Sequence, residues 1–193
     1  MSNHVAAVCR SCFFQLRQLR AVRKSLSSEA TEILIHSFVS GRLDYCNSLL
    51  AGISDKLLQR LQSVQNAAAR LVMGLRKFDH ISGTLQKLHW LPVRHRITYK
   101  VALLVFKCLH GLAPAYLAVD CQLTSMISNW RHLRTSSTGV LSAPRTRTSI
   151  GARSFAAIGP VVWNNLPLEI RCLDSSVELF SKRLKTHLMS LCF

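Results

Sequence analysis

Two cysteines separated by two residues, Cys9 and Cys12, have the spacing most typical of a metal site in this chain of 193 residues. A structural zinc ion needs four ligands, and the remaining two usually come from a second pair at similar spacing. The sequence contains no second CxxC and no HxxxH, and His89 and His95 are separated by Pro92. We therefore expect no metal ion and no cofactor, and we interpret Cys9 and Cys12 as thiols packed in a core.

No residue pattern in the sequence indicates a catalytic centre. The aspartates in the middle of the chain are isolated from one another: Asp44, Asp55, Asp79 and Asp120. There is no carboxylate pair for metal-assisted chemistry, no glycine-rich phosphate loop and no GxSxG nucleophile motif. Asp44-Tyr45 is half of a metal-binding motif, but its helical setting favours a structural role. We expect a protein that is not an enzyme, since an enzyme would need a metal centre that the sequence does not show.

Positive charge is the strongest chemical signal in the sequence. Lys and Arg number 25 against 9 Asp and Glu, which gives a net charge of +16. Acidic residues are absent from residues 1–28 and 121–168, and between His80 and Val119. Such a surplus favours nucleic acid as the partner, with an anionic membrane second. Several separated basic faces would follow a phosphate backbone better than one cluster would.

Cysteine usage and hydropathy bear on where the protein works. The seven cysteines lie mostly in apolar runs, and there is no signal peptide. We expect reduced thiols in an intracellular protein, nuclear or cytoplasmic and not secreted. No apolar run approaches the roughly 20 residues of a membrane helix, so we expect no membrane partner.

Aromatic and basic residues are interleaved around one turn of the chain. Phe78, His80, His89 and Trp90 lie near Arg76, Lys77, Lys87 and Arg94. This arrangement can stack bases while it holds phosphates. For Trp90 a second interpretation is stronger, because its neighbours Leu88 and Leu91 are apolar and predict a core position.

The elements that must position these side chains are helices. Apolar residues recur three or four positions apart and predict an all-α bundle of about six helices. The central helix has Pro92 at its start and Gly111 just past its end. The other predicted helices cover residues 5–25, 28–41 with a continuation or second short helix over 42–46, 54–74, 114–123, 151–158 and 177–191. Residues 78–88 are expected to form a short connector with one helical turn. Gly159-Pro160 is expected to stop the helix over 151–158, and the residues from Trp163 to Pro167 are expected to form an irregular connection whose Trp163 fills the core. Ser175 to Glu178 fit a capping box.

Composition divides the chain into four ranges. We expect thumb-like N-terminal helices over 1–78, a central helical segment over 79–124, a basic loop over 125–150 and a C-terminal helical segment over 151–193 packed on the rest. The basic loop contains two Arg- and Thr-rich stretches, residues 131–138 and 144–148. It is expected to be an exposed loop or a weak hairpin, and it is either a plain linker or an arm that contacts phosphates.

Several motifs, in order along nearly the whole chain, carry a resemblance. They are CRSCFFQLRQLR (9–20), RLDYCNSLL (42–50), LQSVQNAAARLV (61–72), LHWLPV (88–93), HGLAPAYL (110–117), PRTR (144–147) and WNNLPLEIR (163–171). In these motifs the chain resembles the region after the polymerase core in LINE-type (jockey-like, non-LTR) retrotransposon reverse transcriptases, which are RNA-directed DNA polymerases. The resemblance implies a thumb and C-terminal segment that helps to grip RNA or the primed duplex. It places the endonuclease and the polymerase palm, with its paired aspartates, upstream of Met1.

The resulting hypothesis is a non-catalytic segment with sequence-tolerant affinity for the backbone of RNA or DNA. We expect no small-molecule substrate, and protein partners are unknown. The predicted phosphate contacts are Arg17, Arg20, Arg23, Lys24, Arg76, Lys77, Arg94, Arg96, Arg145 and Arg147. The alternative is a structural or protein-interaction helical module whose charge is incidental, and a chain without a cellular function is also compatible with the sequence.

Overall fold

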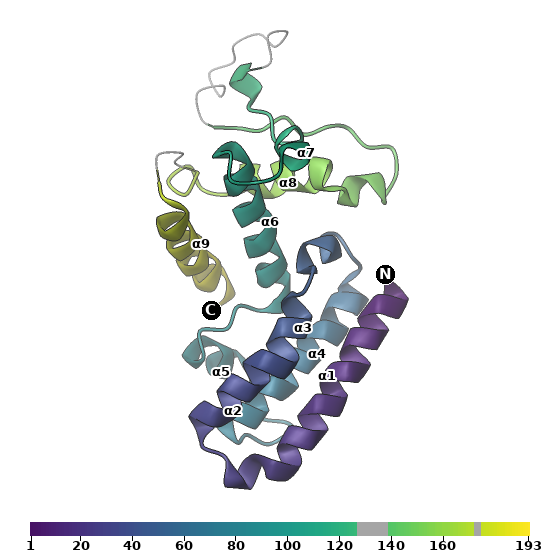
Figure 1. Ribbon diagram of the computed structural model, residues 1–193, viewed down its shortest axis with the longest axis vertical. Helices are drawn as coiled ribbons and strands as arrows, with labels where there is room; N and C mark the ends of the chain where they lie inside the picture. Colours follow the sequence, from purple (N-terminus) through teal and green to yellow (C-terminus); the bar gives the residue numbers. More distant parts are fainter. Residues whose placement is uncertain (127–138, 172–174) are drawn as a thin grey trace. The chain divides into compact units, whose positions relative to one another are not determined.

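The computed structural model describes residues 1–126, 139–171 and 175–193. Within these ranges the chain is all-α, as its sequence predicts, and the helices form two compact units (Figure 1). Unit 1 comprises Met1–Arg96 together with Leu188–Phe193, and unit 2 comprises Ile97–His187. These units divide the chain differently from the four predicted ranges, whose domain organisation stays a prediction.

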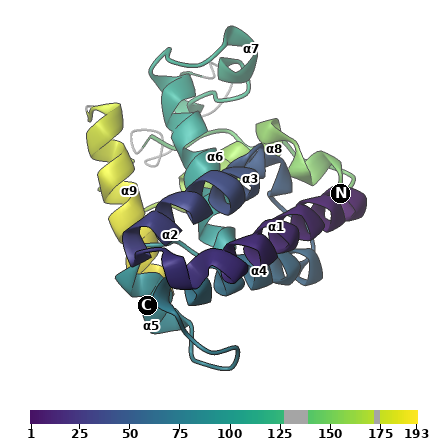
Figure 2. The same cartoon turned by 60° about the horizontal axis from the view of Figure 1, so that its bottom comes forward.

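Helix α1, Ser2–Val22, presents one apolar stripe to the core of unit 1. The buried residues of the stripe are three or four positions apart, which places them on one side of the helix: Val5, Cys9, Cys12, Leu16 and Leu19. Helix α4, Asp55–Met73, packs alongside α1 (Figure 2). Its small residues Ala68 and Ala69 are buried in the core of the unit.

The second helical stretch continues past Gly41, in agreement with the continuation predicted over 42–46, and ends at Asp44. It consists of α2 (Ser28–Ile35), a π-helical turn (His36–Ser40) and α3 (Gly41–Asp44). Gly41 has an ordinary helical φ of −56°, so the chain continues through it. The stretch begins as predicted, because the Ser27 hydroxyl accepts a hydrogen bond of 3.1 Å from the Ala30 N–H.

Helix α4 ends at a glycine as predicted, and a short helix follows it. Gly74 has a φ of +64°, the left-handed conformation that ends many helices. Helix α5, Ser82–Lys87, forms the single helical turn expected in the connector before the central helix. The short η1, Arg23–Ser25, and η3, Asn47–Leu50, are 3₁₀ turns that join the longer helices of unit 1.

Two glutamines of α4 hold the start of α6, Val93–Leu109. The side-chain amide of Gln65 donates to the Leu91 carbonyl at 2.8 Å, and Gln62 Oε1 accepts from the Val93 N–H, also at 2.8 Å. The N–H groups of a first helical turn have no partner within the helix, so Gln62 satisfies one that would otherwise be orphaned. Helix α6 thus begins directly after Pro92, and Gly111 follows its end with a φ of +67°.

The core of unit 2 is a cluster of three aromatic rings. Phe106 of α6 stacks on Phe180 of α9, Val177–Cys192, with 4.1 Å between ring centroids. Trp163 lies 5.8 Å from Phe180 and is completely buried, which confirms its predicted place in a core. This unit also contains the short α7, Ala115–Ala118, and the 3₁₀ turns η4, Thr124–Met126, and η6, Gly151–Arg153.

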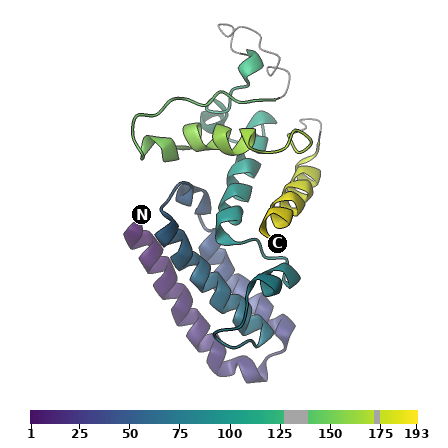
Figure 3. The same ribbon diagram turned by 180° about the vertical axis from the view of Figure 1, so that it is seen from behind.

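Helix α8, Phe155–Asn164, corrects the prediction that Gly159-Pro160 stops a helix. The helix runs through both residues and crosses α6 (Figure 3). A Cβ at Gly159 would lie 3.2 Å from Val105 Cγ2, so a glycine allows the close crossing. Packing of this face outweighs the hydrogen bond that Pro160 cannot donate. Trp163 and Asn164 therefore belong to a helix and not to an irregular connection.

Trp163 and Asn164 hold the chain around Leu141. Asn164 exchanges two hydrogen bonds with the backbone of Leu141, at 2.9 and 2.8 Å, and Trp163 Nε1 donates to the Gly139 carbonyl at 2.9 Å. Leu141 also forms an antiparallel bridge with Leu123. Residues 139–141 of the predicted basic loop are thus anchored to α8, whereas its first Arg-rich stretch, residues 131–138, lies outside the described residues.

The start of α9 differs by one residue from the predicted capping box. The hydroxyl of Ser176, rather than Ser175, accepts a hydrogen bond from the Leu179 N–H at 3.2 Å. Glu178 follows the cap by two residues, whereas a capping box needs the Glu three residues after the cap. Glu178 still lies in the first turn, where its negative charge interacts favourably with the helix dipole.

Candidate nucleic-acid interface

A cavity of about 530 Å³ lies between α1 and the end of α4 in unit 1. One wall comes from α1 and the start of η1, between Phe13 and Arg23, and the other from α4 and the loop after it, between Ala67 and Lys77. Five basic side chains line the cavity, and none of the described residues that line it is acidic. The five are Arg17, Arg20, Arg23, Arg70 and Lys77. Four of these were predicted phosphate contacts, brought together from distant parts of the sequence.

The α1 wall is built by residues that lie off the buried stripe. Phe13, Arg17 and Arg20 are three or four positions apart, so they follow one another along the same side of the helix. All three are exposed. Neither guanidinium is hydrogen-bonded or ion-paired with a residue that the structure describes. This side of α1 therefore presents two unpaired cations and an accessible ring.

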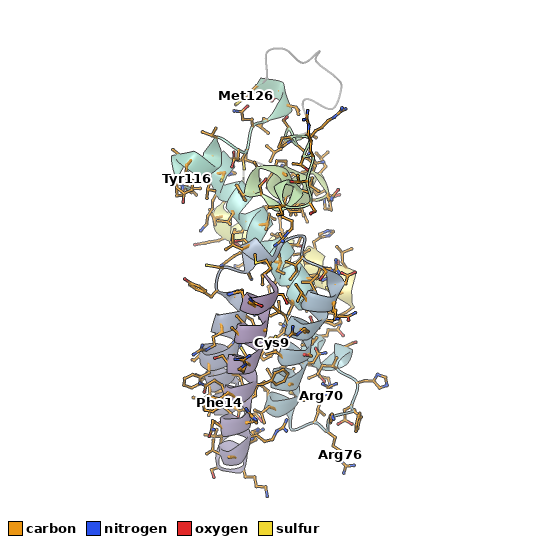
Figure 4. All side chains as sticks on the ribbon, turned by 90° about the vertical axis from the view of Figure 1, so that its right-hand side faces the viewer. Cys9, Phe14, Arg70, Arg76, Tyr116 and Met126 are labelled. Atoms are coloured by element: carbon orange, nitrogen blue, oxygen red, sulfur yellow. The ribbon has the colours of Figure 1, made fainter. Side chains whose placement is uncertain are left out.

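The α4 wall depends on Arg70 and the turn that follows it. Arg70 Nη2 donates to the Asp79 carbonyl at 3.1 Å, and the Asp79 carboxylate accepts from the Arg76 N–H at 2.7 Å. These bonds fold residues 76–79 against the end of α4, where Figure 4 shows Arg70 and Arg76. Lys77 thereby borders the cavity, and its Nζ lies 5.3 Å from the ring centroid of Phe78.

Arg70 is the functional candidate that the predicted contacts omit. Its position in the last turn of a basic helix was visible in the sequence, but its direction depends on the packing of α4. Arg70 Nε is buried and has no hydrogen-bond partner among the described residues. The guanidinium therefore keeps unused donor capacity beside the cavity.

Arg23 has a structural role that sequence reasoning did not anticipate. Its Nε donates to the Leu71 carbonyl at 3.0 Å and its Nη2 to the Val72 carbonyl at 3.0 Å. Its Nη1 also donates to the Leu26 carbonyl at 2.9 Å. The last carbonyls of a helix lack partners within the helix, so Arg23 closes the end of α4 and joins it to the end of α1.

Helix dipoles account for part of this positive charge. The C-terminal ends of α1 and α4 lie together, since Arg23 follows one and binds the other. Each end carries a partial negative charge that cations stabilise. Arg20 in the last turn of α1 and Arg70 in the last turn of α4 contribute to this balance. Arg17 and Lys77 lie outside these last turns, so the cavity has a positive surplus beyond what the helix ends require.

The other predicted contacts do not share the cavity. Lys24 and Arg76 are exposed nearby, and Arg145 and Arg147 are exposed in unit 2. Arg94 forms an ion pair with Asp55. The side chain of Arg96 is only 18% exposed and lies 3.2 Å from the Asp44 carboxylate. Because these last two guanidinium groups have carboxylate partners, we leave them out of the proposed interface.

The interleaved aromatic residues have different environments. Trp90 is 4% exposed and meets His36 edge-on at 5.2 Å, so the core interpretation is confirmed and base stacking by Trp90 is wrong. Phe78 is 88% exposed, and His80 and His89 are also exposed. Phe13, which is not among the aromatic residues that the sequence predicts to stack on bases, is 38% exposed and borders the cavity. The sequence indicated this exposure, because Phe13 lies outside the apolar stripe of α1 that is buried.

Cys9 and Cys12 are buried on the inner stripe of α1. Burial raises the pKa of the Cys12 thiol to about 11 and also raises the pKa of Cys9. Metals bind thiolates, so this environment opposes binding. Among the described residues, no group of three or more His, Cys, Asp or Glu side chains is placed to hold a metal ion.

Within the described ranges, no helix combines the length and the apolar character needed to cross a bilayer. Comparison of the chain with models of protein families, with curated proteins and with solved structures finds no match.

Proposed function

We propose that this protein binds the phosphate backbone of RNA or DNA without sequence preference and without catalysis. The observation that carries the proposal is the cavity of unit 1, where five basic residues from α1, α4 and the segments that follow them converge and no described lining residue is acidic. Arg17 and Arg20 have no partner among the described residues, so their charges are available to a polyanion. Phosphate groups suit these side chains, because one guanidinium can donate two parallel hydrogen bonds to the oxygens of one phosphate.

The resemblance to LINE-type reverse transcriptases supports the same class of partner. Under this proposal the chain corresponds to the thumb and C-terminal segment of such a protein, and its helices hold the basic side chains apart for the nucleic acid. Two of the resembling motifs meet inside unit 1, where Gln62 and Gln65 of the LQSVQNAAARLV motif bind the LHWLPV backbone. Asp44 of the RLDYCNSLL motif pairs with Arg96, three residues after LHWLPV. These motif residues support the fold on which the basic cavity is built.

The test measures binding of the full chain to an unstructured single-stranded oligonucleotide by fluorescence anisotropy, at a series of increasing salt concentrations. Three to four phosphate contacts give a slope of log K against log salt of about −2 to −3. Oligonucleotides of the same length and different sequence should bind within a few-fold of one another. An affinity that does not change with salt would contradict the proposal.

A protein-interaction module is the second candidate, and one surface of unit 2 favours it. Leu112, Tyr116 and Val119, at and around α7, are 60%, 74% and 66% exposed. Exposed apolar side chains at this spacing are typical of a surface that another protein covers. A protein complex that survives high salt and contains no nucleic acid would favour this candidate over the first.

A further inference from the structure

The cavity of unit 1 has an apolar floor beneath its cations. Leu16 and Leu71 are buried there, and Phe13 contributes a ring that is 38% exposed. A site for phosphate alone needs donors and no such floor. A volume of about 530 Å³ lies within the range of small-molecule sites and is large enough for more than a phosphate group. The ligand must therefore combine negative charge with an apolar body.

The arrangement of the cations further limits the chemical class of the ligand. Arg17 and Arg20 are one turn apart along α1, and Lys77 borders the cavity from the opposite wall. An acyl chain with a single anionic head would need cations at one end only. Cations repeated along the wall match a chain of phosphates, with a flat body beside each phosphate.

We propose that the cavity takes an unstacked base of a single-stranded nucleic acid, which stacks on Phe13 while its flanking phosphates lie on Arg17 and Arg20. This inference rests on the proposed function and adds to it a preference for single strands. Bases of a duplex are stacked within it and cannot enter, whereas a single strand can turn a base outward. Every base has a π-face, so stacking on a ring tolerates any sequence.

The experiment compares two probes with equal backbone charge, each about twelve nucleotides long. One is oligothymidylate, and the other has the same sugar-phosphate backbone with abasic sites throughout. For the full chain we expect oligothymidylate to bind at least about fivefold more tightly, since stacking on one aromatic side chain contributes on that scale. The salt slopes of the two probes should be alike, because both present the same phosphates.

The chain supplies its own matched control. Phe14 adjoins Phe13 on α1 and is 51% exposed, but it does not line the cavity. Phe13→Leu keeps an apolar side chain and removes the ring, so it should abolish the preference for oligothymidylate. Phe14→Leu should retain the preference, and Phe13→Tyr, which keeps a ring, should retain it as well.

The outcomes distinguish the proposed base site from the proposed binding of the phosphate backbone. Equal binding of both probes by the wild-type chain, with steep salt dependence, would overturn the base site and leave phosphate binding intact. Loss of the preference in Phe14→Leu as well as Phe13→Leu would also overturn it. Absence of binding to either probe would remove both proposals. Attachment of the wild-type chain, but not Phe13→Leu, to vesicles of anionic phospholipid, with equal binding of the two oligonucleotides, would identify an acyl site instead.

Discussion

Replacing Arg17 and Arg20 together tests whether the cavity of unit 1 binds phosphates. Both side chains are exposed on one side of α1 and have no hydrogen bond or ion pair among the described residues. The double substitution Arg17→Gln and Arg20→Gln therefore removes two charges and breaks no described contact. Glutamine is a good helix former, so α1 should lose only the dipole stabilisation that Arg20 contributes in its last turn, about 0.3–1 kcal/mol.

The size of the effect follows from counterion release. Each phosphate contact with a single strand contributes about 0.7 to the slope of log K against log salt, so losing two contacts should reduce the slope by about 1.4. At a salt concentration of about 0.1 M each contact is then equivalent to about fivefold in affinity, and two contacts to about 25-fold. The loss should shrink toward zero as the salt concentration approaches 1 M.

The measurement is anisotropy of a labelled single strand over a salt series, with a control that removes the same charge elsewhere. Arg10 of α1 and Arg60 of α4 are exposed on the same two helices and do not line the cavity. Arg10→Gln with Arg60→Gln has the same net charge as the test variant. We expect the control to lose only a few-fold in affinity, through the general field of the protein.

Equal losses in the test and control variants would refute the reasoning, because binding would then depend on net charge and not on this cavity. An unchanged slope in the test variant would refute it too, since both guanidinium groups would be shown to make no phosphate contact.

Three further predictions concern the fold that supports the cavity. Arg23→Ala should lower the free energy of unfolding by about 1.5–3 kcal/mol, because charged hydrogen bonds to the end of α4 are lost, whereas exposed Lys24→Ala should change it little in urea titrations. Phe180→Ala should cost about 3–5 kcal/mol in the same assay, since Phe180 is fully buried against Phe106, and a loss below 1 kcal/mol would contradict the described packing. Burial, with a smaller contribution from a neighbouring arginine, lowers the pKa of His95 below its usual 6.5, so the unfolded state takes up a proton first as the pH falls. Stability should therefore be complete above the unfolded pKa and decline as the pH falls from about 6.5 toward the folded pKa, by up to about 1.4 kcal/mol per pH unit; His95→Gln should flatten this part of the curve, and an identical curve would contradict the role of His95.

Several residues that the sequence associates with function have structural roles in the folded protein. Gln62, Gln65 and Asp44 belong to motifs that a reader of the sequence would associate with function, yet in the structure they tie helices together. Arg23 was a predicted phosphate contact, and its guanidinium closes a helix end. Hydrogen-bond partners far apart in sequence decide such roles, and no local pattern reveals them.

Local rules predict the helices well because helix formation depends on spacing and end signals. The stripe from Val5 to Leu19, the Ser27 cap and the left-handed Gly74 and Gly111 are all visible in the chain and present in the structure. The helix through Gly159-Pro160 was missed for a tertiary reason. Its glycine face packs against Val105, and that contact outweighs the local signal to stop.

By itself, the sequence determined the all-α class, the positive surplus and which face of α1 is apolar, since these depend on composition and on neighbours three or four residues away. Only the tertiary structure decided which basic residues share a site. Arg17 and Arg70 are distant in sequence, and they line one cavity because α1 and α4 pack with their ends together. Trp90 is buried beside His36, whereas Phe13 is partly exposed at the cavity, so Phe13 replaces Trp90 as the candidate for stacking. Burial and proximity are properties of how helices meet, and a one-dimensional pattern does not contain them.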